Sequence, residues 1–79
     1  MEVKMKYEVE VWYKPGVTDA VGDSVKKGIR DLNIKGTESV KTGQVYIISG
    51  KLGKKDIEKI CEGLLSNNVV QFYKVKQVK

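Results

Sequence analysis

The chain has 79 residues, of which 41% are hydrophobic, and a net charge of +5 from 15 basic and 10 acidic side chains. This length predicts one small domain, residues 1–79, whose thin core favours cover from a second copy or a larger partner. The absence of histidine and the single cysteine exclude imidazole catalysis, His-ligated metals and an internal disulfide. No apolar run approaches the roughly 20 residues that span a bilayer, so we expect a soluble cytoplasmic protein without a membrane partner.

The first third of the sequence predicts a strand followed by a helix. Residues 5–13 alternate between two sets of side chains, a period of two that is typical of a β-strand. Pro15 ends this strand, since proline has no amide hydrogen to donate to a sheet. Thr18-Asp19 then offers a helix cap. Apolar residues recur three or four positions apart as far as Leu32, and Asn33 is a suitable stop.

The rest of the sequence predicts a hairpin, a helix and a last strand. Residues 37–42 indicate a weak strand and residues 44–49 a strong one, with a glycine between them that suits a tight turn. Residues 56–66 have helical apolar spacing, and residues 69–78 form the last strand. The order β-α-β-β-α-β predicts an α+β fold. The expected form is a ferredoxin-like two-layer sandwich, with two helices on one face of a four-stranded antiparallel sheet.

The face of this predicted sheet that the helices leave open is unusually apolar. An exposed sheet face is normally polar, and apolar residues on adjacent strands form a patch that monomers rarely expose. We therefore expect a second copy of the chain to cover it. The alternative is that these residues are scattered and that lysine stems cover them. The predicted oligomer interface consists of Trp12, Tyr46, Ile48, Val70 and Phe72.

The candidate reactive groups do not form a catalytic arrangement. Cys61 lies on the apolar side of the second predicted helix and is expected to be a buried small hydrophobe, because no histidine can activate it. Glu8 and Glu10 share one face of the first strand and are interpreted as a solvated or interfacial charge pair. The loop at residues 50–55 lacks the glycine spacing of a P-loop. The sequence predicts no catalytic residue, no cofactor-binding residue and no metal ligand.

The positive charge allows a nucleic-acid partner, but its distribution argues against one. The basic residues are mostly lysines spread along the chain, and strand 44–49 has one aromatic residue and no arginine, which fails the RNA-recognition signature. We expect no nucleic acid, and the alternative function is a stand-alone ferredoxin-like module that binds a small ligand or nucleic acid. An acyl-phosphate-cleaving enzyme of this topology would need an arginine after the first strand, where residues 14–17 have none.

Three segments of the chain together are typical of one protein family. They are residues 14–22 (KPGVTDAVG), residues 39–43 (SVKTG) followed by Tyr46, and residues 60–70 (ICEGLLSNNVV) followed by Tyr73. In this order and spacing, from about Lys6 to Val75, the chain resembles the PurS family. That family is the small subunit of phosphoribosylformylglycinamidine (FGAM) synthase in purine biosynthesis.

The resemblance implies a bridging subunit with no catalytic residues of its own. A large synthetase subunit would use ATP and Mg²⁺ to activate the amide of formylglycinamide ribonucleotide, while a glutaminase subunit would release ammonia from glutamine. The small subunit would join the two and help the ammonia reach the synthetase without loss to water. It would bind no cofactor itself, and it would form a homodimer or a dimer of dimers.

Overall fold

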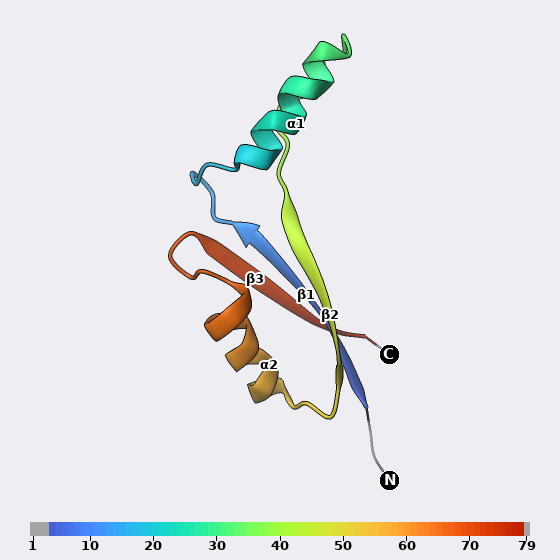
Figure 1. Cartoon of the computed structure of the whole chain (residues 1–79), viewed down its shortest axis with the longest axis vertical. Coiled ribbons are helices and arrows are strands. Elements are labelled where there is room, and N and C mark those ends of the chain that lie inside the picture. Colours follow the sequence, from blue (N-terminus) through green and yellow to red (C-terminus); the bar gives the residue numbers. More distant parts are fainter. Residues whose placement is uncertain (1–3, 79) are drawn as a thin grey trace.

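The computed structural model describes residues 4–78. Its elements are β1 (Met5–Tyr13), α1 (Ala20–Asp31), β2 (Gly43–Gly50), α2 (Lys54–Ile60), a π-helical turn η1 (Cys61–Leu65) and β3 (Gln71–Val78). Within this part of the chain, β1 is the centre of a three-stranded antiparallel sheet with the order β2-β1-β3. Helix α2 lies beside this sheet, whereas α1 extends beyond the ends of the strands (Figure 1). The result is an elongated α+β protein of 56 × 27 × 14 Å.

The predicted four-stranded sheet and the placement of both helices on one face are wrong. Residues 37–42 form no strand, so the predicted hairpin is absent and the described sheet has three strands. The physical reason is the position of α1, which projects away from the sheet, so the chain returns alongside this helix rather than alongside a strand (Figure 1). Both edges of β1 are already paired, with β2 and with β3.

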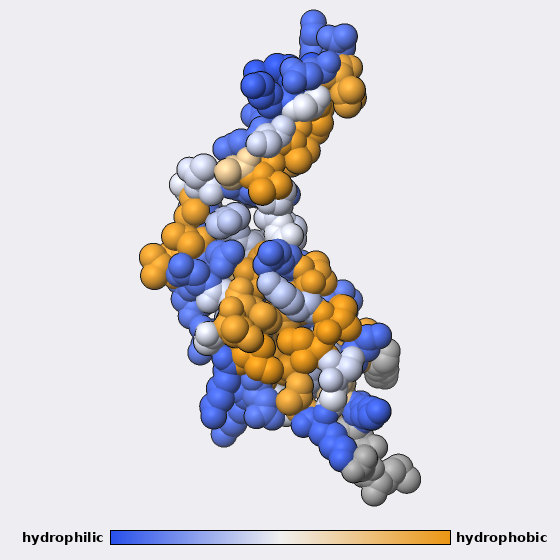
Figure 2. Space-filling model, in the orientation of Figure 1, coloured by the Kyte–Doolittle hydropathy of each residue, from blue (hydrophilic) through white to orange (hydrophobic). Residues whose placement is uncertain are grey.

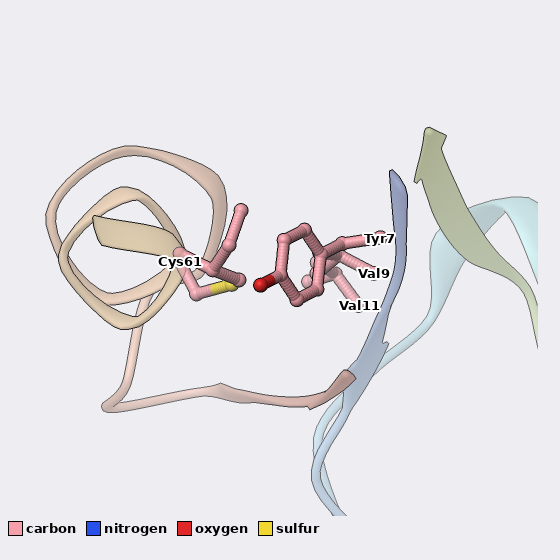
Figure 3. Close-up of a cluster of buried hydrophobic side chains, with 5 residues drawn as sticks. Tyr7, Val9, Val11 and Cys61 are labelled. Atoms are coloured by element: carbon pink, nitrogen blue, oxygen red, sulfur yellow. The ribbon is translucent and has the colours of Figure 1, made fainter. Parts of the chain in front are cut away.

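One half of the molecule has a closed core between the sheet and α2. On β1, Tyr7, Val9 and Val11 are at most 3% exposed, and on the helical side Ile57 and Cys61 are fully buried. Figure 3 shows the side chains of β1 directed toward Cys61. The Tyr7 hydroxyl donates a hydrogen bond of 3.2 Å to the carbonyl of Leu52, which satisfies its polar end. Fully burying each large apolar side chain is worth about 1.5–3 kcal/mol, so this cluster stabilises the half that contains it.

Local capping sets both ends of α1 where the sequence predicts them. Of the two candidate caps, Asp19 is the one used: it is extended and accepts a 2.8 Å hydrogen bond from the amide of Gly22. At the other end, Asn33 adopts a left-handed φ of 64°, and its amide donates to the carbonyl of Arg30 at 2.9 Å. Asparagine tolerates this conformation better than most residues, which is why it ends helices.

Candidate functional site

The sheet has an inner face, toward α2, and an outer face on its other side. Residues directly opposite one another on paired strands point to the same face. Trp12 on β1 lies opposite Phe72 on β3, and both point away from the buried odd-numbered residues of β1. The register therefore places Trp12 and Phe72 together on the outer face, as alternation predicts. Val70 lies just before β3 and is half-buried, and its carbonyl accepts a 2.9 Å hydrogen bond from the amide of Lys14.

The predicted position of Tyr46 and Ile48 on the open face is wrong. They lie opposite Val9 and Tyr7, and they pack against the buried core on the inner face. The reason is that β2 is apolar at four consecutive positions, residues 45–48. Such a run does not indicate which residues face the core, and only the pairing with β1 determines it. The other two residues of this run, Val45 and Ile47, lie on the outer face instead. Whether Tyr46 and Ile48 take part in an oligomer interface stays a prediction.

Helix α1 carries an uncovered apolar surface, here called the α1 stripe. Its members are Val21, Val25, Ile29 and Leu32. Val21 is 63% and Leu32 72% exposed, and the apolar side chains run along one side of the projecting helix (Figure 2). An isolated helix of 12 residues is marginal in water, because most helices in proteins depend on packing of their apolar face. The helical periodicity predicted this stripe but not that it would lie apart from the sheet.

The inner face of the sheet also has an uncovered part, close to the base of α1. A hollow there has a volume of about 300 Å³, and Val11, Tyr13 and Val21 line it together with polar residues. Tyr13 is 40% exposed and Val75 is 39% exposed, although both belong to apolar inner positions of their strands. Helix α2 therefore covers only part of the inner face, and the rest is open to a further apolar element.

The base of α1 is fastened to the segment before β2 by the Asp19 clamp, which consists of Asp19, Gly22 and Thr42. Besides capping Gly22, the Asp19 carboxylate accepts the Thr42 amide at 2.6 Å and the Thr42 hydroxyl at 2.7 Å. The hydrogen bonds from the Gly22 amide, the Thr42 amide and the Thr42 hydroxyl lower the pKa of Asp19. Gly22 packs so closely that a Cβ would lie 2.5 Å from the Val40 carbonyl oxygen. The direction of α1 is thus fixed at its root.

Two of the candidate reactive groups, Cys61 and Glu10, have a structural role in the protein, one through burial and the other through a hydrogen bond. Cys61 is fully buried, as predicted, and burial, followed by the charges of Glu62 and Glu58, raises the pKa of its thiol. Glu10 accepts a hydrogen bond of 3.0 Å from the indole of Trp12, so it orients an aromatic ring. Within residues 4–78, no cluster of His, Cys, Asp and Glu could hold a metal ion. No helix in the same part of the chain is long and apolar enough to cross a membrane.

A closed core, an apolar helix that projects from it and a second apolar sheet face define a small protein of the α+β class. Comparisons with known proteins show its family. The PurS family model, described as phosphoribosylformylglycinamidine (FGAM) synthase, matches residues 6–79. The chain therefore belongs to the PurS family. It is also 33% identical over 73 residues to the phosphoribosylformylglycinamidine synthase subunit PurS of Archaeoglobus fulgidus, with coverage of 86% of this chain and 91% of that protein.

Solved structures share the fold over nearly the whole chain. Bacillus subtilis PurS matches with a TM-score of 0.84 and 23% identity, over 95% of this chain and 99% of that one. Methanocaldococcus jannaschii PurS gives 0.79 and 23%, over 95% and 96%. A chain in the PurLQS structure from Thermotoga maritima gives 0.79 and 23%, over 96% and 99%. Matches of this extent necessarily include most of α1, so the projecting helix is part of the shared fold.

Proposed function

We propose that this chain is the small subunit of FGAM synthase and acts by joining its glutaminase and synthetase subunits so that ammonia passes between them. The observation that carries this proposal is the match of the family model to residues 6–79. The structure supports a docking role, because large apolar side chains of α1 and of the sheet are exposed and the cysteine thiol is buried. In this role, the chain itself contributes no catalytic group.

The partners we propose are those of the three-part synthase. The Thermotoga maritima PurLQS structure contains a chain with this fold, which supports placing the present chain in an equivalent complex. ATP and Mg²⁺ would then belong to the large synthetase subunit, and this chain would bind neither. Its contribution would be to hold two subunits in place so that ammonia moves between them without dilution or protonation in bulk water. The work would take place in the cytoplasm, without nucleic acid.

We further infer that the α1 stripe is covered by a second copy of the chain. In a two-fold dimer the same surface of each copy meets the other. Here the stripe of each α1 would pack over the open inner face of the other copy, near Tyr13 and Val75. The two surfaces are both apolar, and α1, at about 18 Å for its 12 residues, is long enough to cross several strands. Burying the stripe would add roughly 1.5–3 kcal/mol for each large side chain.

The predicted interface residues then divide between two kinds of contact. Tyr46 and Ile48, on the inner face, lie on the side that the second copy would cover. Trp12 and Phe72, on the outer face with Val70 beside it, remain available for a contact between dimers or with another subunit. A dimer of dimers is thus compatible with the arrangement, because the two apolar surfaces lie on different sides of the sheet.

The proposed function is tested by mixing the purified chain with the synthetase and glutaminase subunits of the same organism. We expect a complex and a large gain in glutamine-dependent FGAM formation when all three are present. Ammonium chloride at high concentration should bypass the requirement, since external ammonia replaces the transferred one. Absence of both a complex and a gain in glutamine-dependent activity would reject the proposal, and binding to RNA instead would favour the stand-alone module.

A further inference from the structure

A pocket of about 340 Å³ lies at the junction between the outer face of the sheet and the turn that leads to α1. We call it the aromatic–lysine pocket. Three aromatic residues and three lysines among its lining residues define its character: Trp12, Tyr13, Phe72, Lys14, Lys41 and Lys74. Tyr13 also lines the hollow on the inner face, so the pocket adjoins the surface proposed for the second copy. Trp12 and Phe72 point to the other side of the sheet.

The aromatic wall of the pocket is held in place by other residues. The indole Nε1 of Trp12 donates to the carboxylate of Glu10 at 3.0 Å. On β2, Gly43 lies opposite Trp12, and a Cβ on Gly43 would come within 2.8 Å of the Trp12 ring. Glycine at this position therefore allows the ring to lie directly over the backbone of β2. With Phe72 opposite Trp12 on the other side, the sheet presents a preformed aromatic surface to an occupant.

The rim of the pocket is positively charged. Three lysines line it against one carboxylate, that of Asp19, and this carboxylate is already engaged in the clamp with Gly22 and Thr42. The Lys14 ammonium group donates to the carbonyl of Asn68 at 2.6 Å, which holds it near the rim. A charge balance of this kind attracts an anionic occupant. Of the two contacts open to Trp12 and Phe72, it favours the one with another subunit over the one between dimers, because a further copy of this chain has a net charge of +5 as well.

The backbone around the pocket favours carboxylates over a phosphate group. Phosphate sites commonly use several free backbone amides. Here Pro15 has no amide hydrogen, and the amides of Lys14, Val17 and Thr42 already donate to acceptors within the chain. The Asp19 carboxylate in the lining would also repel a doubly charged phosphate. The positive charges of the lining all belong to lysine side chains, and these suit separate carboxylates on a flexible segment.

We propose that the aromatic–lysine pocket binds an acidic peptide segment of another synthase subunit. A large apolar side chain of that segment would rest on Trp12 and Phe72, and carboxylates on either side of it would face Lys41 and Lys74. This inference rests on the proposed function and adds the surface through which a subunit is recruited. Aromatic residues in a desolvated pocket with charged neighbours are the usual source of binding energy and of specificity in such contacts.

The first test measures assembly with the glutaminase and synthetase subunits. Lys41→Glu and Lys74→Glu should each raise the Kd of the complex by tenfold or more, with the largest effect at low salt, because rim charges act on association. Lys55→Glu makes the same charge change on α2, outside the pocket, and should alter the Kd less than twofold. Equal effects of all three variants would overturn the proposal. Assembly and activity would then still support the proposed function, whereas failure of the wild-type chain to assemble would overturn both.

The second test uses the isolated chain and reports on the pocket alone. Trp12 is the only tryptophan, so its fluorescence reports occupancy directly. The probe peptide acetyl-Glu-Phe-Glu-amide should change this fluorescence with a Kd at least fivefold lower than that of acetyl-Lys-Phe-Lys-amide, and Lys41→Glu should abolish the difference. The proposal is overturned if the two peptides bind equally or not at all, or if 5′-AMP binds more tightly than the acidic peptide.

Discussion

The half of the molecule built from the sheet and α2 completes its own core, whereas the half that contains α1 does not. Both helices are amphipathic, yet Ile57 on α2 is fully buried while Val21 and Val25 on α1 are exposed. The difference does not come from composition, since both stripes are made of apolar side chains. It comes from where the connecting segments direct each helix. An apolar stripe therefore indicates that a helix packs against another apolar surface. It does not indicate whether that surface belongs to the same chain or to another molecule.

The projection of α1 is a fixed feature of the fold. The Asp19 carboxylate ties the first turn of α1 to Thr42 just before β2, and Gly22 packs against the backbone at Val40. These contacts hold the root of the helix while its far end extends away from the sheet (Figure 1). A helix that is anchored at one end and bare along its apolar side is suited to reach a neighbouring molecule.

The largest effect on stability is expected in the closed half. Ile57→Ala removes a fully buried side chain and should lower the free energy of unfolding by about 2–5 kcal/mol, because the core would keep a cavity. Val69→Ala, at a position that is 81% exposed, should change it by less than about 0.5 kcal/mol. Urea denaturation at one fixed protein concentration measures both. Similar midpoints for the two variants would show that this half is not a self-contained core.

In the α1 half, the corresponding substitution should affect association. Val25→Glu places a charge in the α1 stripe, and we expect the Kd of the homodimer to rise about 100-fold, or roughly 2.7 kcal/mol. Lys27→Glu changes the charge of the same helix outside the stripe and should leave the Kd within a few fold. Sedimentation equilibrium of both variants distinguishes these results. An unchanged mass for Val25→Glu would remove the stripe from the interface.

The clamp that joins the two halves should tolerate no side chain at Gly22. Gly22→Ala would bring a Cβ to 2.5 Å from the Val40 carbonyl oxygen, and forced displacement of backbone typically costs about 1–3 kcal/mol. At Gly63 an added Cβ meets nothing within 4 Å, so Gly63→Ala should be neutral or stabilise by up to about 1 kcal/mol. Thermal denaturation of the two variants measures the difference in their melting temperatures. Equal melting temperatures would mean that the close packing at the clamp is not maintained in solution.

Lowering the pH should have a smaller effect on the stability of the folded protein, and this effect acts through the Asp19 clamp. Because hydrogen bonds lower the pKa of Asp19 below its ordinary 3.8, its carboxylate stabilises the folded state at all pH values above 3.8. That contribution is lost as the pH falls below 3.8 through the lowered value. The melting temperature of Asp19→Asn should therefore lie below wild type at pH 6, and the gap should narrow at pH 3. A gap in melting temperature that is the same at pH 6 and pH 3 would contradict this role of the Asp19 carboxylate.

Much of the local structure could be predicted from the sequence. The alternation at residues 5–13 gave both bounds of β1, since Pro15 follows and cannot pair. The Asp19 cap and the left-handed Asn33 bracket α1 because side-chain and backbone conformation act within one turn. The burial of Cys61 followed from its place on an apolar helical face.

What the sequence did not reveal are relations between distant segments. Residues 45–48 of β2 are apolar on both sides, so periodicity could not place Tyr46 and Ile48, and pairing with β1 put them on the inner face. Residues 37–42 have strand-like composition, but the chain returns beside the projecting α1 there and forms no strand that could pair with β2 (Figure 1). The aromatic–lysine pocket was missed because it combines residues from three separate parts of the chain. The one signal was Trp12 and Phe72 on a face that should be polar.

Hydrogen exchange of the α1 amides tests most directly whether a second copy of the chain covers α1. We expect the amides of residues 20–31 to become protected as the chain concentration rises through the Kd of the dimer, while those of β1 are protected throughout. If the α1 amides exchange as fast as those of the free helical peptide at every concentration, with β1 still protected, the proposed dimer is contradicted.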